Sequence, residues 1–164
     1  MVEDGQGFMA LLICRTQGWT CAVPVAQVRE TMRPQAITRM PDAPGHVLGM
    51  AVIRGMATPV LDLGVLLGGA PVQAGRFILM TVQAQGTQPE QPPQRLALAV
   101  EQVEGIRAVP AAELQSLPSL LQGPAPSMVL ATTRQDATLL MLLDSVRLMS
   151  LAQGQGGTAS EPSA

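Results

Sequence analysis

Segment 47–69, VLGMAVIRGMATPVLDLGVLLGG, constrains the fold most because it is almost wholly apolar and its few polar residues fall at fixed points. Arg54 and Gly55 divide it into two short apolar runs, 49–53 and 56–61. Glycine supplies the positive φ that a tight hairpin turn requires. The dipeptide therefore predicts a β-hairpin that holds Arg54 in solvent at its tip.

Two more residues in this segment carry structural information. Pro59 cannot donate a ladder hydrogen bond, so we expect the second strand to be an edge strand there or to be ending. Asp62 follows that strand, and a carboxylate at a helix N-cap accepts hydrogen bonds from free backbone N–H groups, which stabilises by ~1 kcal/mol. Asp144, in LLDSVRLMSL, repeats this arrangement near the end of the chain. Both aspartates are predicted to cap short helices.

Strand-like segments with turn residues between them run through most of the chain. Segment 26–44 is rich in turn residues, and segment 83–94 (QAQGTQPEQPPQ) is typical of a long polar loop. The sequence AAELQSL indicates a short helix within 109–121. The further hairpins expected pair 8–14 with 19–25, 76–82 with 95–103, and 128–132 with 137–143.

The sequence also contains an internal repeat. Segment 22–30 (AVPVAQVRE) resembles 97–105 (ALAVEQVEG), and segment 60–67 (VLDLGVLL) resembles 142–149 (LLDSVRLM), in the same order. Two matches in one order indicate a duplicated unit. We therefore predict an all-β fold of two similar lobes. Each lobe is expected to be a small barrel of about five strands with an aspartate-capped helix.

The two cysteines, Cys14 and Cys21, flank the sequence RTQGWT. If Gln17 and Gly18 form a two-residue turn, the cysteines face each other across the hairpin. A cross-strand disulfide is then geometrically conceivable. In a reducing compartment the favoured interpretation is two small buried hydrophobic side chains.

Composition excludes several classes of function. The net charge is −2 and only 2% of residues are aromatic, which argues against nucleic-acid binding. The acidic start lacks the positive region of a signal peptide, and no stretch reaches the ~18 apolar residues of a membrane span. We therefore expect a cytoplasmic protein without membrane insertion. Apolar residues make up 47% and charged residues 13%, so some apolar surface is expected to remain for partners.

No pattern in the sequence predicts catalysis. His46 is the only histidine, which argues against a zinc site and leaves one candidate base for a serine triad. No nucleophile elbow or phosphate-binding loop is present. Because Asp62 and Asp144 are explained as helix caps, we expect neither enzymatic activity nor a metal or cofactor.

The sequence resembles the CheW-like domain, the coupling fold of bacterial chemosensory systems. VLGMAVIRGMATPVLDLGVLLG resembles the family signature, and CAVPVAQVRE, ALAVEQVEGI and MLLDSVRLM resemble its other motifs. The resemblance covers residues 8 to about 151. It implies two five-stranded SH3-like barrels on a shared hydrophobic core, with short helices, in one domain (1–151) followed by a disordered tail (152–164). It also implies an adaptor that links the cytoplasmic tips of methyl-accepting chemoreceptors to a CheA-type histidine kinase.

The same resemblance assigns partner-binding residues. Arg54 and Glu30 fall on family positions for exposed partner contacts, or for a salt bridge to each other. The alternative for Glu30 is a solvated loop charge. Arg39 matches a position that is often basic in the family. Val28 and Met32 are expected to supply hydrophobic contact with the kinase.

The sequence departs from the family pattern at several positions. Cys21 stands where an aromatic residue is usual, Glu101 supplies the acidic residue of the V-D-x-V motif, and a glycine expected before the last hairpin is missing. These departures keep open an adaptor of a non-flagellar pathway that binds only one of the two partners. A small-molecule-binding barrel or enzyme is a further alternative, which a deep polar pocket around His46 would favour.

Overall fold

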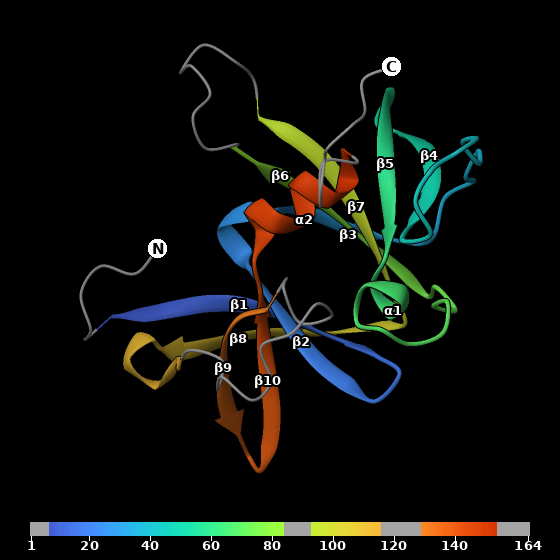
Figure 1. The fold of residues 1–164 in the computed structure, drawn as a ribbon. Helices are drawn as coiled ribbons and strands as arrows, with labels where there is room; N and C mark the ends of the chain where they lie inside the picture. Colours follow the sequence, from blue (N-terminus) through green and yellow to red (C-terminus); the bar gives the residue numbers. More distant parts are fainter. Residues whose placement is uncertain (1–6, 84–92, 116–128, 154–164) are drawn as a thin grey trace, which may run out of the picture.

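The computed structural model describes residues 7–83, 93–115 and 129–153, which form two five-stranded sheets and two short helices (Figure 1). Sheet A has the strand order β8-β1-β2-β10-β9, and sheet B has the order β3-β6-β7-β5-β4. The mainly β, two-sheet architecture predicted from the sequence is confirmed. The strands are β1 (Phe8–Thr16), β2 (Trp19–Pro24), β3 (Val28–Met32), β4 (Val47–Ile53), β5 (Met56–Asp62), β6 (Arg76–Val82), β7 (Gln94–Val100), β8 (Gln102–Pro110), β9 (Val129–Gln135) and β10 (Thr138–Leu143), and the helices are α1 (Leu63–Leu66) and α2 (Ser145–Ala152).

The predicted hairpin tips are present. Arg54 (φ +52°) and Gly55 (φ +77°) join β4 to β5, and Gln17 (φ +54°) and Gly18 (φ +83°) join β1 to β2. Positive φ at both central residues gives the turn twist that matches paired strands. The last hairpin turns at 136–137, whereas the segments expected to pair, 128–132 and 137–143, place the turn slightly earlier, within 133–136.

Three predictions of local structure were wrong. Segment 26–44 contains a regular strand, β3, in which partly buried and exposed residues alternate. The strand was missed in the sequence because it contains charged residues. The strand expected over 95–103 is two strands, because the chain leaves sheet B at Glu101 and continues in sheet A. The helix expected within 109–121 is only a 3₁₀ turn, η2 (Ala111–Glu113), and residues 116–121 lie outside the described residues.

Each half of the chain changes sheet after its second strand, so β1 and β2 lie in sheet A and β3 to β5 in sheet B, whereas β6 and β7 lie in sheet B and β8 to β10 in sheet A. β3 follows β2 but pairs with β6 in sheet B, and β8 follows β7 but pairs with β1 in sheet A. The internal repeat explains the parallel ladders, since Ala22 pairs with Leu142 and its counterpart Ala97 pairs with Val60. Two similar units are therefore present, but each sheet contains strands from both halves of the sequence.

Neither sheet closes into a barrel through a continuous ladder, so the predicted five-stranded barrels are open, curled sheets. An isolated bridge joins the segment after β3 to β4, with Thr38 N donating to Met50 O at 2.8 Å and Met50 N donating to Thr38 O at 2.9 Å. Gln115 and Thr132 make the matching bridge at sheet A. Gly49 allows the first bridge, because a Cβ there would lie 2.3 Å from Thr38 O and the residue has φ +142°. The open, curled sheets are consistent with SH3-like subdomains.

Strand alternation divides the apolar residues among three clusters. Leu11 and Ile13 of β1 belong to the cluster inside the curl of sheet A. Leu12 and Cys14, on the opposite face of the strand, belong to the cluster shared with sheet B. The largest cluster includes residues of both sheets and of both helices, and Figure 1 shows α2 between the sheets. This cluster is the shared core predicted from the family resemblance.

The position of Pro59 within β5 is explained by where the pairing of β5 with β7 ends. β5 lies between β7 and β4, so it is not an edge strand over its whole length. However, β5 pairs with β7 only from Val60 to Asp62. Pro59 therefore has a ladder partner on one side only, as a residue without an N–H requires.

Asp62 and Asp144 occupy the N-caps of the two helices. Asp62 accepts a hydrogen bond from Val65 N at 3.0 Å, and Asp144 accepts from Val146 N at 3.1 Å and Arg147 N at 3.3 Å. Helix α2 extends to Ala152, one residue into the segment predicted to be a disordered tail. Residues 154–164 of that tail and 84–92 of the predicted polar loop lie outside the described residues. Within the described part of the chain, we find no helix with the length and apolarity needed to span a membrane.

Cys14 and Cys21 pair across the β1–β2 hairpin, and both thiols are free and buried. This corresponds to the favoured interpretation of two buried hydrophobic side chains. Burial raises the pKa of Cys21 to about 12. Burial also raises the pKa of Cys14, and the nearby Cys21 and Glu104 add to the effect.

These shifts predict that the protein loses stability in alkaline solution. A folded-state pKa above that of the unfolded chain stabilises the fold fully below the unfolded value, about pH 8.5. This stabilisation is lost as the pH rises toward 12. Between pH 8 and pH 10 we expect the free energy of unfolding to fall by about 2 kcal/mol for each thiol, and so by about 4 kcal/mol in total, measured by urea unfolding with a reductant present.

The composition makes this measurement specific. The chain has no tyrosine, and its ten basic residues are all arginine, so cysteine is the only side chain that titrates in this range. A Cys14→Ala/Cys21→Ala variant is the control and should lose little stability over the same interval. An equal loss in the variant and the wild type would contradict the assignment to the thiols.

Candidate partner-binding site

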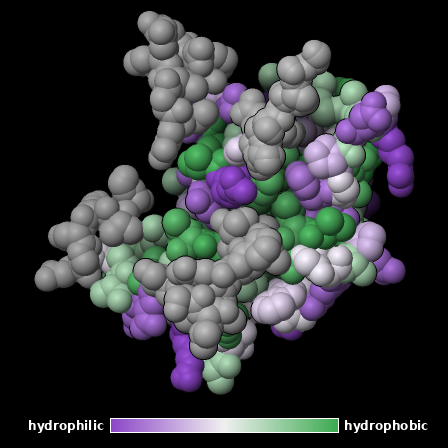
Figure 2. Space-filling view, viewed as in Figure 1, coloured by the Kyte–Doolittle hydropathy of each residue, from purple (hydrophilic) through white to green (hydrophobic). Residues whose placement is uncertain are grey.

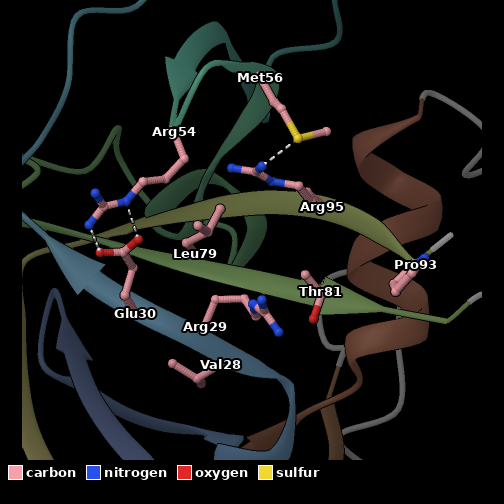
Figure 3. A pocket seen from close by; sticks show the side chains of 9 residues that line it. All are labelled: Val28, Arg29, Glu30, Arg54, Met56, Leu79, Thr81, Pro93 and Arg95. Atoms are coloured by element: carbon pink, nitrogen blue, oxygen red, sulfur yellow. Dashed lines mark hydrogen bonds and ion pairs between the residues drawn. The ribbon is translucent and has the colours of Figure 1, made fainter.

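The outer end of sheet B brings together two charged residues that are 24 positions apart. Glu30 lies on β3, and Arg54 lies at the tip of the β4–β5 hairpin, which the curl of sheet B places beside β3 (Figure 3). Arg54 Nε donates to Glu30 Oε2 at 2.8 Å, and Arg54 Nη2 donates to Glu30 Oε1 at 2.8 Å. The two planar groups therefore form a bidentate ion pair.

This ion pair faces solvent. The side chain of Arg54 is 70% exposed and that of Glu30 is 30% exposed. The hydrogen bond from Arg54 lowers the pKa of Glu30 against an opposing effect of desolvation, the charges of Arg54 and Arg95 lower it further, and Glu30 in turn raises the pKa of Arg54. Both groups are therefore charged at neutral pH. Because exposed ion pairs contribute little to stability, this one is better suited to recognition.

Two grooves flank the pair. The larger has a volume of about 640 Å³, and Val28 contributes to its wall beside Leu79 and Thr81 (Figure 3). The smaller, of about 340 Å³, lies on the side of Met32 and Gln35. Val28 and Met32 thus each line one groove, with the ion pair lining both.

Arg95 is a component of the larger groove that sequence reasoning missed. It lies on β7, and its guanidinium reaches the β4–β5 hairpin, where Nη2 donates to Ile53 O at 2.8 Å and Nη1 contacts Met56 Sδ at 2.8 Å (Figure 3). The signal was available, because Arg95 is a charged residue at the start of the otherwise apolar run LALAV. Arg29 of β3 lines the same groove and was also missed.

The structure brings together four of the five predicted partner-binding residues. Arg54, Glu30, Val28 and Met32 border the two grooves. Arg39 is exposed, lies next to the bridge at Thr38, and lines neither groove. The caps Asp62 and Asp144 lie apart from this site and serve the helices.

The corresponding end of sheet A has a different character. A smaller groove of about 110 Å³ there includes Arg15, Glu104 and Asp136. Arg15 Nη1 pairs with Glu104 Oε2 at 3.3 Å. Asp136 occupies the hairpin tip that corresponds to Arg54, so the tip charge is reversed between the two sheets.

Apolar side chains reach the surface of the molecule, as the composition predicted. Figure 2 shows apolar atoms exposed among polar ones on the face it presents. Near the site, Val52 is 69% exposed and Met56 is 52% exposed. The other exposed large apolar residues are Phe8, Trp19, Met40, Ile106, Leu130 and Leu139.

The three grooves described above do not surround His46, so they give no support to the small-molecule alternative. The half-buried His46 is hydrogen-bonded through Nε2 to Leu151 O at 3.1 Å, and it lines none of the three grooves described above. Among residues 7–83, 93–115 and 129–153, no group of three or more His, Cys, Asp or Glu side chains could hold a metal ion. Three guanidinium groups and one carboxylate suit the larger groove to ionic recognition of a protein surface.

Comparison with known proteins is consistent with this description. The family model of the CheW-like domain matches residues 10–153. A search of curated proteins found no match. Among solved structures, the scaffolding protein TtCheW from Thermoanaerobacter tengcongensis is similar, with a TM-score of 0.69 and 17% sequence identity over 82% of this chain and 88% of the other. At that identity the likeness shows a common fold.

Proposed function

Because the chain belongs to the CheW-like domain family, we propose that it is a non-catalytic adaptor that couples chemoreceptors to a CheA-type histidine kinase. The observation that carries the proposal is the exposed Glu30–Arg54 ion pair, which lies between two grooves with apolar walls. We place the adaptor in the cytoplasm, where receptor tips and kinase meet, and treat residues 1–151 as one domain.

The site has the composition of a protein interface. Protein interfaces combine apolar residues with arginine, and a few such residues carry most of the binding energy. Here Arg54 stands between Val28 and Met32, which line the two grooves and are only partly buried. We propose that the regulatory domain of the kinase docks on this face of sheet B, with the two apolar side chains as its hydrophobic contacts.

A second candidate is an adaptor of a non-flagellar chemosensory pathway that binds only one of the two partners. The difference between the two hairpin tips favours it. Arg54-Gly55 of sheet B corresponds to Asp136-Ala137 of sheet A, so sheet A carries the opposite charge and lacks the turn glycine. A partner that recognises an arginine tip would therefore find it on one sheet only.

A binding experiment with three components tests the proposal. The regulatory domain of a CheA-type kinase and a receptor tip fragment, both from the same organism, are titrated separately and together with the wild-type chain. Binding of both, and formation of a ternary complex in size-exclusion chromatography, is the expected result. Binding of one fragment alone would support the second candidate, and binding of neither would overturn both.

A further inference from the structure

The larger groove beside the ion pair carries an excess of positive charge. Arg29, Arg54 and Arg95 line it together with a single carboxylate, Glu30. Both carboxylate oxygens of Glu30 accept hydrogen bonds from Arg54. Among the described residues neither Arg29 nor Arg95 forms a salt bridge, and Arg95 has only a longer-range attraction to the already paired Glu30, although the chain as a whole has a net charge of −2.

Arg95 is held in place by neutral groups. Its two terminal nitrogens contact the carbonyl of Ile53 and the sulfur of Met56. Its Nε is buried and has no hydrogen-bond partner within the described chain. A partly buried guanidinium without a countercharge is unfavourable, and a carboxylate brought close to it relieves that cost.

The positions of the Arg29 and Arg95 guanidinium groups define where such a carboxylate would fit. Figure 3 shows Arg29, from β3, and Arg95, from β7, on opposite sides of Leu79 and Thr81. Leu79 is buried and gives this part of the groove an apolar floor, and the hydroxyl of Thr81 lies beside it. The exposed Met56 and the partly buried Val28 add apolar wall.

We propose that this groove binds an acidic side chain of the protein partner, with its carboxylate over Leu79 and Thr81 between Arg29 and Arg95. An apolar residue next to the acidic one in the partner packs against Val28 and Met56. This inference rests on the proposed function and specifies the partner chemistry of the same site. Arg54, already paired with Glu30, then lies at the edge of the interface.

The repeat in the chain shows that this arrangement belongs to sheet B alone. In the alignment of segment 22–30 with 97–105, Arg29 corresponds to Glu104, and the same offset relates Thr20 to Arg95. The groove at sheet A thus has an acid and a neutral hydroxyl where sheet B has two guanidinium groups. An acidic segment would therefore distinguish the two ends of the molecule.

The test uses the full chain with the kinase regulatory domain and the receptor tip fragment as probes, titrated at several salt concentrations. We expect Arg29→Met and Arg95→Met each to weaken binding of the kinase regulatory domain by about tenfold and to flatten its salt dependence, because a lost charge pair removes an electrostatic contribution. Arg134→Met, an exposed arginine of β9, is the matched control and should bind as the wild type does.

Arg95→Met also removes the hydrogen bond to Ile53, so thermal unfolding is recorded for each variant, and Arg29→Met keeps the test valid if Arg95→Met fails to fold. A second step replaces acidic residues of the affected probe with arginine one at a time. Restored binding of one such probe by Arg29→Glu supports the proposal. Wild-type affinity and salt dependence in Arg29→Met overturn it while the adaptor function stands. A wild-type chain that binds neither probe overturns the adaptor function, and this inference with it.

Discussion

Asp62→Ala is expected to lower the free energy of unfolding by about 3 kcal/mol, because it leaves two partly buried N–H donors without acceptors. Asp62 is 1% exposed. It accepts from Val65 N at 3.0 Å in helix α1, and from Val72 N at 3.0 and 3.1 Å in the segment that leads to β6. A single carboxylate thus starts the helix and fixes the connection to the next strand.

The pseudo-equivalent residue provides a matched control. Asp144 also caps a helix, but it is only partly buried, and within the described part of the chain its carboxylate bonds only the first turn of α2. Asp144→Ala should therefore cost about 1 kcal/mol, the usual value for an N-cap. Urea unfolding followed by far-UV circular dichroism measures both losses. Equal losses in the two variants would show that the bond to Val72 contributes nothing measurable.

The local features that the sequence predicted correctly are those fixed by a few adjacent residues. Gln17-Gly18 and Arg54-Gly55 specify two-residue turns, and the turns specify the registers that place Cys14 opposite Cys21 and Ile53 opposite Met56. The two aspartate caps follow from the same kind of short-range chemistry.

The change of sheet within each half could not be predicted in this way. Ala22–Leu142 and Ala97–Val60 are parallel pairs between distant segments, and the repeat predicts that the two pairs are equivalent without indicating which sheet each strand joins. The break at Glu101 was missed for a related reason. Strands β7 and β8 are contiguous in sequence, and the change of sheet depends on Glu101 N donating to Arg15 O at 3.1 Å, across the molecule.

The charged residues of the candidate site were predicted only where they fall on family motif positions. Arg54 and Glu30 fall on motif positions, and the structure joins them in one ion pair. Arg29 and Arg95 fall outside the family assignment, because their importance arises from the curl of sheet B, which brings β3, β7 and the hairpin tip around one groove. Arg39 shows the converse, because it falls on a family position and yet lines neither groove.

Arg54→Glu is expected to reduce affinity for the partner that docks on sheet B by at least about a hundredfold, as hot-spot arginines do. The variant places a second carboxylate beside Glu30, so it breaks the ion pair and reverses the charge presented at the hairpin tip. Because both side chains reach solvent, the melting temperature should change by less than about 3 °C. Isothermal titration with the kinase regulatory domain and the receptor tip fragment measures the affinities.

The double variant Glu30→Arg/Arg54→Glu separates two explanations of that loss. It restores an ion pair with the charges exchanged. If the pair served only to hold β3 against the hairpin, the double variant would recover wild-type affinity. We expect it to remain defective, because the partner contacts the arginine itself. Arg15→Glu, which breaks the Arg15–Glu104 pair at the corresponding end of sheet A, should leave affinity for this partner unchanged, and a loss as large as that of Arg54→Glu would contradict the assignment of the site to sheet B.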